Sequence, residues 1–310
     1  MPVNVLFAAR SEKWDEYRAP LSRALAEAGV DAELATDHPA DQVDYIVYAP
    51  NSGVQDFTLF PRARAVLNLW AGVEDVVHNP TLRLPLARMV DDGLTRGMVE
   101  WVLGHCLRHH LGMDAHIHGQ DGQWRSAVPP LARDRKITIL GLGALGQACA
   151  RALADVGFDV TGWARRARSL PGVTCRHGDA GLDQALDGAE IVVLLLPHTP
   201  QTEGILDARA LARLAPGAVV LNPGRGALID DAALIAALDR GDLAHATLDT
   251  FRTEPLPEAH PFWAHPRITV TPHIASATRP DSASRVIAEN IRRGEAGEDF
   301  LHLVDRDAGY

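Results

Sequence analysis

The pattern of apolar residues along the chain alternates between short apolar runs, typical of buried strands, and apolar residues at helical spacing. It predicts strands and helices in alternation. The apolar run at 3–9 is typical of a buried strand, and residues 14–28 carry apolar side chains at helical spacing up to Gly29. Short strand-like segments follow at 30–34 and 45–48. This order predicts βαβ units, in which helices connect parallel strands.

The same alternation continues through the rest of the sequence. Residues 65–70 predict a strand that leads into a glycine-containing loop, and the pattern over 98–118 is helical. A polar loop at 118–130 separates this helix from a series of strand-like segments with helices between them: KITIL, VGFDVTGWA, AEIVVLLL, AVVLNPG, HATLDTF and RITVTPH. The series predicts an α/β fold with a doubly wound parallel sheet. A last helix near 280–293 is expected to cross back onto the first domain.

Composition and charge narrow the class of protein. The 310 residues correspond to about two domains of ordinary size. The longest apolar run, Ile191–Leu196, is far shorter than the roughly 20 residues of a membrane span, and residues 1–10 lack the pattern of a secretory signal. Three cysteines without CxxC spacing favour a reducing, cytoplasmic location, and a net charge of -10 argues against nucleic-acid binding.

A glycine-rich turn follows the strand that begins at Ile137. Its glycines, Gly141, Gly143 and Gly146, have GxGxxG spacing between an apolar strand and an alanine-rich helix. In a dinucleotide site the first glycine permits the tight turn, the second lets the backbone approach the pyrophosphate, and the third lets helix and strand pack closely. The flanking strand and helix therefore predict a dinucleotide cofactor.

The end of the next strand indicates which dinucleotide is preferred. An acidic residue there would bind the ribose hydroxyls of NAD, but the chain has Ala164 at this position, followed by Arg165, Arg166 and Arg168. Guanidinium groups bind phosphate in a bidentate manner. The sequence thus predicts NADP(H) as the cofactor, with NAD(H) as the weaker alternative if the arginines are incidental.

Three more segments place one ionisable side chain each just after a predicted strand. Arg225, Glu254 and His273 stand at these positions, where open α/β sheets bind ligands. Reduction of a 2-keto acid requires a cation for the substrate oxygens, an acid that protonates the forming alkoxide, and a carboxylate that orients the acid. Arginine, histidine and glutamate fit these roles in turn, so we predict Arg225, His273 and Glu254 as the catalytic residues.

At this point the sequence resembles the D-isomer-specific 2-hydroxyacid dehydrogenase family, and within it the bacterial glyoxylate/hydroxypyruvate reductases. The resemblance covers nearly the whole chain and rests on the ordered segments GLGALG, LLLPHTPQTEGI, LNPGRGALIDDAAL, LDTFRTEPLP and HPRITVTPHIASAT. It implies two Rossmann-like domains with the cofactor and active site in the cleft between them. Residues 1–97 plus 277–310 would form the flavodoxin-like substrate-binding domain, and 98–276 the dinucleotide-binding domain.

The resemblance also implies roles for further residues. It supports Arg225, Glu254 and His273 as the catalytic residues, and it places the carboxamide of the nicotinamide on Asp249. The remaining cofactor contacts implied are Ala144, Leu145, Trp163, Leu196, Pro197, Thr202, Pro223, His273 and Ser276. The substrate is expected at Tyr48, Trp70, Ala71, Gly72, Val73 and Arg225, with the backbone amides of 71–73 binding its carboxylate.

These features predict NADPH-dependent reduction of small 2-keto acids, glyoxylate or hydroxypyruvate, and the resemblance implies a homodimer. The alternatives are an NAD-dependent dehydrogenase of another 2-hydroxy acid and a regulatory protein that senses the nucleotide without catalysis. No metal is expected, although His105 and His109 lie one helical turn apart in a histidine-rich stretch. Trp124, in the long loop that reaches the partner subunit in relatives, has either a functional role or one in interface packing.

Overall fold

The computed structural model describes residues 2–310, which form two compact units. One unit comprises the chain up to Leu94 together with Ala277–Tyr310, and the other comprises Thr95–Ser276. From the sequence, the first boundary is expected after residue 97. Each unit is built on a parallel sheet with helices on both faces, so the α/β fold class is confirmed.

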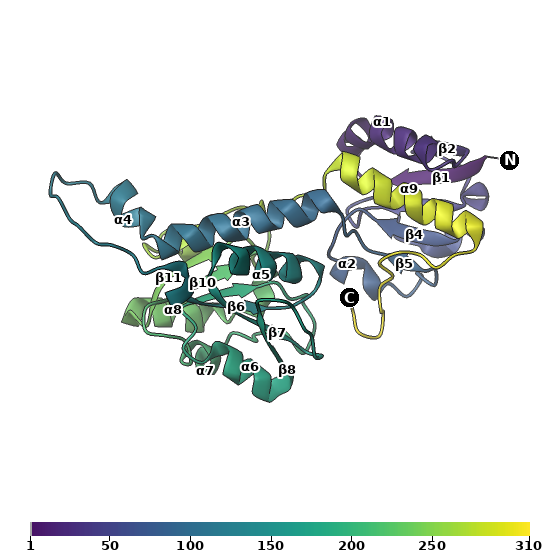
Figure 1. Cartoon of the computed structure of the whole chain (residues 1–310). Coiled ribbons are helices and arrows are strands. Elements are labelled where there is room, and N and C mark those ends of the chain that lie inside the picture. Colours follow the sequence, from purple (N-terminus) through teal and green to yellow (C-terminus); the bar gives the residue numbers. More distant parts are fainter. Residues whose placement is uncertain (1) are drawn as a thin grey trace. The chain divides into compact units, whose positions relative to one another are not determined.

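The first unit contains a five-stranded parallel sheet in the order β2-β1-β3-β4-β5. Its strands are β1 (Val3–Ala8), β2 (Ala32–Ala35), β3 (Tyr45–Tyr48), β4 (Ala65–Asn68) and β5 (Leu86–Ala87). Helices α1 (Ser11–Glu27) and α9 (Pro280–Ala296) lie side by side on one face, as Figure 1 shows. The helix expected to return to the first domain is therefore α9.

A second apolar cluster covers the other face of this sheet. It includes Phe57 and Phe60 near the short helix η2 (Phe57–Leu59) and Val76 and Val77 of α2 (Glu74–Val77). The short helix η1 (Ala40–Gln42) precedes β3. Burial on both faces explains why the central strand β3 is apolar and buried at every position instead of alternating.

The second unit contains a seven-stranded parallel sheet in the order β12-β11-β10-β9-β6-β7-β8. Its strands are β6 (Lys136–Leu140), β7 (Asp159–Ala164), β8 (Thr174–His177), β9 (Ile191–Leu194), β10 (Ala218–Asn222), β11 (Leu243–Leu248) and β12 (Ile268–Val270). The strand order reverses at β6, which is the topological switch point of a dinucleotide-binding fold. Strand β8 has no counterpart among the expected strands, because its residues are polar and mostly exposed.

Helices pack on both faces of the second sheet. Helices α3 (Asp92–His110) and α5 (Ala144–Val156) cover one face, and α6 (Gly178–Leu186), α7 (Ala208–Leu211) and α8 (Asp231–Arg240) cover the other (Figure 1). The short helices η3 (Ala132–Asp134), η4 (Gly226–Leu228) and η5 (Pro261–Trp263) lie in the connections. Within residues 2–310, none of the helices combines the length and the apolar character needed to cross a membrane.

The helix expected at 98–118 differs from the observed structure at both ends. It begins at Asp92 and is interrupted after His110, and α4 (Met113–His118) follows as a separate helix. Gly112 between them has a φ of 62°, in the left-handed region that ends an α-helix. The apolar periodicity continues across this glycine, which is why the sequence predicts a single helix.

Candidate active site

Three adjacent strands of the second unit carry the predicted catalytic residues. Arg225 follows β10, Glu254 lies in the loop after β11, and His273 lies in the loop after β12, with β10, β11 and β12 neighbours in the sheet. The carboxyl ends of parallel strands share one edge, so these residues gather there although 48 positions of sequence separate the first from the last.

A hydrogen-bonded pair of side chains forms the centre of this edge. His273 Nδ1 lies 2.6 Å from Glu254 Oε2, and Glu254 Oε1 accepts a hydrogen bond of 2.8 Å from the backbone N–H of Phe251. His273 has a φ of 53°, in the left-handed region that residues other than glycine rarely adopt. Such backbone geometry is maintained only where the surroundings fix it, and it is common at functional sites.

Electrostatics favour the ionised forms of both members of the pair. The hydrogen bond to Glu254 raises the pKa of His273 above its ordinary value, and burial and the charge of Arg225 only partly oppose this effect. Burial acts to raise the pKa of Glu254, but the hydrogen bonds from His273 and from the Phe251 N–H, with the charge of Arg225, outweigh it and leave the pKa lowered. The site therefore stabilises an imidazolium beside a carboxylate.

Asp249 holds the loop that carries His273. Its fully buried carboxylate accepts hydrogen bonds from the Thr271 hydroxyl (2.6 Å) and from the backbone N–H groups of Ile274 and Ala275 (both 2.9 Å). The backbone N–H of His273 also donates to the Asp249 carbonyl at 2.9 Å. What the structure shows for Asp249 is thus the anchoring of this loop, and the contact with a nicotinamide carboxamide remains a prediction.

Two asparagines that the sequence predictions did not include fix the loops at strand ends. Asn222 ends β10, and its Nδ2 donates to the carbonyl of Arg225 at 2.9 Å. Asn68 ends β4 in the first unit, and its Nδ2 donates to the carbonyls of Trp70 and Gly72 at 3.0 and 2.9 Å. The signal in the sequence was an asparagine that ends an apolar strand directly before a predicted ligand loop.

The three glycines of the GxGxxG turn lie in distinct environments. Gly141 has a φ of 108°, and a Cβ there would come 2.4 Å from the carbonyl oxygen of Leu195. A Cβ on Gly146 would come 1.7 Å from the carbonyl oxygen of Gly141. Around Gly143, at the start of α5, no atom beyond its immediate neighbours in the chain lies within 4 Å of where a Cβ would be. The turn thus needs two of its glycines for its own packing, whereas the third borders open space.

Other predicted cofactor residues lie in the same unit as this turn. Ala144 and Leu145 form the start of α5, and the side chains of Arg165, Arg166 and Arg168 are exposed after β7. Thr202 Oγ1 lies 2.7 Å from the carbonyl oxygen of Pro197 and shapes that loop. Leu196, Pro223 and Ser276 belong to the same unit, in the loops after β9, β10 and β12.

Two predicted site residues have buried side chains instead of forming open walls. Trp163 lies in the apolar core, where its Nε1 donates to the carbonyl of Gly178 at 2.8 Å. Tyr48 is only 1% exposed, and its ring centroid lies 5.3 Å from that of Phe57. Both are large aromatic residues at strand ends, where the sequence does not distinguish a core side chain from one that faces a ligand.

The remaining predicted substrate residues belong to the first unit. Trp70 is partly exposed, Ala71 and Gly72 are half-buried, and Val73 is buried at the start of α2. The two hydrogen bonds from Asn68 define the backbone of this loop.

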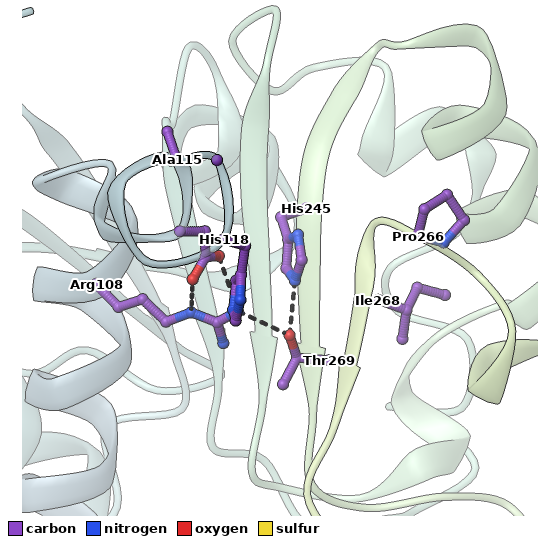
Figure 2. Close-up of a pocket in the computed structure, with 9 residues that line it drawn as sticks. Arg108, Ala115, His118, His245, Pro266, Ile268 and Thr269 are labelled. Atoms are coloured by element: carbon purple, nitrogen blue, oxygen red, sulfur yellow. Dashed lines mark hydrogen bonds and ion pairs between the residues drawn. The ribbon is translucent and has the colours of Figure 1, made fainter. Parts of the chain in front are cut away.

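A polar cluster connects the end of α3 with β11 and β12, and His109 of α3 belongs to it through contacts with Thr247 and His245. A cavity of about 520 Å³ is lined there by Arg108, Asp114, Ala115, His118, Gly119, His245, Pro266, Ile268 and Thr269. Figure 2 shows Arg108 and His245 both directed at Thr269, whose hydroxyl lies 3.0 Å from Arg108 Nη2 and 2.8 Å from His245 Nε2. None of the predicted catalytic residues lines this cavity.

Comparison with known proteins agrees with this description. Residues 101–275 match the family described as D-isomer specific 2-hydroxyacid dehydrogenase, NAD binding domain. This stretch covers more than half of the chain. The chain belongs to the D-isomer specific 2-hydroxyacid dehydrogenase family.

Individual relatives place the chain more closely within this dehydrogenase family. It is 38% identical to glyoxylate/hydroxypyruvate reductase A of Serratia proteamaculans, over 99% of this chain and 100% of that protein. A D-isomer specific 2-hydroxyacid dehydrogenase from Xanthobacter autotrophicus Py2, solved with NADPH and MES, has a TM-score of 0.93 at 39% identity over 100% of both chains. The NADPH-dependent glyoxylate/hydroxypyruvate reductase of Sinorhizobium meliloti, solved with NADP and sulfate, has a TM-score of 0.86 at 36% identity, over 100% of this chain and 99% of that one.

Proposed function

We propose that this protein is an NADP(H)-dependent reductase of small 2-keto acids that converts glyoxylate to glycolate and hydroxypyruvate to D-glycerate. The observation that carries the proposal is the hydrogen bond of 2.6 Å between His273 and Glu254. Glu254 follows β11, and the neighbouring strand β10 ends before Arg225. The names of the relatives, which include an NADPH-dependent glyoxylate/hydroxypyruvate reductase, support the same reaction.

The residues of the GxGxxG turn fit a dinucleotide. Close approach of a pyrophosphate requires backbone without side chains, and the open space around Gly143 meets that requirement. Helix α5 begins at Ala144, so its first N–H groups and the positive end of its dipole lie at the same turn. NADPH, when bound, supplies the hydride for the carbonyl carbon of the substrate.

The exposed arginines after β7 fit the 2′-phosphate of NADP(H). Arg165, Arg166 and Arg168 follow Ala164, which ends the strand without a carboxylate that would repel the phosphate. In a chain with a net charge of -10, such a local group of guanidiniums provides the attraction for an anion. This arrangement favours NADP(H) over NAD(H).

His273 acts as the general acid. Its Nδ1 faces Glu254, which leaves Nε2 as the ring nitrogen that donates a proton to the carbonyl oxygen as it becomes an alkoxide. Because the bond to Glu254 raises the pKa of His273, the ring keeps its proton to higher pH than an ordinary histidine does. Glu254 thus orients the ring and stabilises its charge.

Arg225 and the loop at 71–73 bind the substrate in this proposal. The guanidinium of Arg225, whose Nη1 donates to the Gly224 carbonyl at 2.7 Å, provides a positive charge for the carbonyl and carboxylate oxygens. The N–H groups of the loop that Asn68 holds would bind the carboxylate.

We further propose a cytoplasmic homodimer. The segment after α3 exposes large apolar side chains, including Ile117, Trp124 and Val128, and Trp124 is 98% exposed. Exposed apolar groups of this size on one segment are typical of an interaction surface. All three cysteines, Cys106, Cys149 and Cys175, are free thiols, which suits a reducing compartment. Light scattering on the wild type and on Trp124→Ser tests the dimer, and a monomeric wild type would disprove it.

The reaction is tested by steady-state oxidation of NADPH and NADH with glyoxylate, hydroxypyruvate, pyruvate and phenylpyruvate in parallel. We expect turnover of glyoxylate and hydroxypyruvate with NADPH, and a loss of about 100-fold or more in kcat for His273→Ala with unchanged NADPH affinity. NADPH binding without turnover of any keto acid would instead support a nucleotide-sensing regulator.

A further inference from the structure

The loop that carries Glu254 is tied to its neighbours by an arginine outside the catalytic trio. Arg252 Nη2 donates to the carbonyl oxygen of Ile229 at 2.8 Å and lies 3.3 Å from that of Ala227. Its Nη1 donates to Glu203 Oε1 at 2.8 Å. One guanidinium therefore connects the loop after β11 with the segment that follows Arg225 and with the loop after β9.

The backbone at this point is packed without space for adjustment. A Cβ on Gly226 would lie 2.0 Å from the carbonyl carbon of Phe251 and 2.3 Å from the backbone nitrogen of Arg252. The segment after Arg225 and the turn that begins at Phe251 thus contact each other directly through their main chains. The hydrogen bonds of the Arg252 side chain add to this main-chain contact.

The same turn orients the carboxylate of Glu254. The N–H of Phe251 donates to Glu254 Oε1 at 2.8 Å, and the other oxygen faces His273. A displacement of residues 251–252 would therefore move the carboxylate relative to the imidazole. An error of about 1 Å in such a catalytic geometry is enough to change a rate by up to 100-fold.

We propose that Arg252 is a positioning residue that holds Glu254 in place against His273. The ion pair with Glu203 is too exposed to contribute much to stability, since its side chains are 39% and 49% exposed. The planar guanidinium has the donors to bind two carbonyl oxygens and a carboxylate together, which a lysine ammonium at the same position could not match geometrically. The inference rests on the proposed function, because it assigns Arg252 to the same site.

Several charged groups lie near Arg252 and near His273. Glu203 also binds His198, with Nε2 2.6 Å from Oε2, and Asp231 of α8 faces Arg252, whose charge counteracts the burial that raises the pKa of Asp231. His273 itself faces Glu254, Arg225 and Asp249. Loss of the positive charge of Arg252 would by itself raise the pKa of His273, so a lowered pKa on replacing Arg252 would report movement of Glu254.

The test is a set of variants with two independent measurements. For Arg252→Gln we expect kcat to fall about 5- to 20-fold with unchanged NADPH affinity, and NMR titration of the His273 ring to give a pKa closer to that of an ordinary histidine. Arg252→Lys should lie between this variant and the wild type, and Glu203→Gln should show a smaller effect because its amide oxygen still accepts a hydrogen bond.

Arg240→Gln is the matched control, since Arg240 forms an exposed ion pair with Asp242 before β11 begins and should leave both measurements unchanged. Wild-type titration of His273 and wild-type kcat in Arg252→Gln would overturn the proposal, whatever the effect on thermal stability. Because the NMR titration needs no turnover, it tests the role of Arg252 even if no 2-keto acid is reduced.

Discussion

Nδ1 of His273 lies 2.6 Å from the carboxylate of Glu254, so that Nε2 is the ring nitrogen left for a substrate. The first of these residues follows the edge strand β12 and the second follows β11. Because of this contact, the protonation of His273 depends on the position of the loop that carries Glu254.

Replacement of Glu254 by glutamine should change the pH dependence of reduction. Because the hydrogen bond to Glu254 raises the pKa of His273, the protonated acid persists above the ordinary value of about 6.5, and the rate should fall only as pH rises through the higher pKa. In Glu254→Gln the fall should begin at lower pH, with kcat at neutral pH reduced about 10- to 100-fold. Profiles of kcat/KM against pH measure this, with Glu258→Gln as the control. An unchanged profile would remove Glu254 from the mechanism.

Two glycines of the GxGxxG turn should respond differently to the same substitution. Gly146→Ala places a Cβ 1.7 Å from the carbonyl oxygen of Gly141, so we expect a loss of about 1–3 kcal/mol or more in the free energy of unfolding. In Gly143→Ala the new methyl meets no atom within 4 Å beyond its immediate neighbours in the chain, so stability should change by less than about 1 kcal/mol while NADPH affinity falls. Urea unfolding and fluorescence titration with NADPH separate the two effects. Tight NADPH binding by Gly143→Ala would argue against close approach of the cofactor there.

Removal of two arginines after β7 should reduce the discrimination between cofactors. In the double variant Arg165→Ala and Arg166→Ala we expect the KM for NADPH to rise at least about 10-fold and the KM for NADH to change much less, because only NADPH carries the 2′-phosphate. Arg151→Ala, an exposed arginine of α5, is the control. Equal effects on both cofactors would show that these arginines do not bind the 2′-phosphate.

Two half-buried histidines, His109 and His245, should make the protein less stable in acid. Burial lowers the pKa of His109 to about 3 and that of His245 to about 4. Below about pH 6.5 the unfolded chain binds protons on these rings and the folded protein does not, so stability is present above that pH and is lost as pH falls toward 4. We expect a decrease on the order of 2 kcal/mol between pH 7 and about pH 4.5.

The measurement is urea unfolding at the two pH values for the wild type and for His245→Gln, in which the decrease should be smaller. His116→Gln is the control, because this ring on α4 is exposed. An equal loss of stability in His245→Gln and the wild type would assign the acid sensitivity to other groups.

The sequence by itself determined the elements and the chemistry at their ends. Apolar runs of strand length and helical spacing specify which segments are buried, and residues such as Gly141 and Gly146 are recognisable because a backbone turn admits no side chain there. Arg225, Glu254 and His273 were predicted to be catalytic because each comes after an apolar segment of strand length. The break at Gly112 was missed because this glycine does not interrupt the apolar pattern. Strand β8 was missed because its polar residues show no apolar pattern.

Only the tertiary structure decided which side chains meet. Trp163 and Tyr48 are equivalent in sequence to residues that face a ligand, but the packing of neighbouring elements turns both rings into the core. The contacts of Asp249 and Arg252 likewise join segments far apart in the chain. Periodicity records whether a position is buried, whereas the partner of a polar group depends on the order of strands in the sheet and on the paths of the loops, which no local pattern encodes.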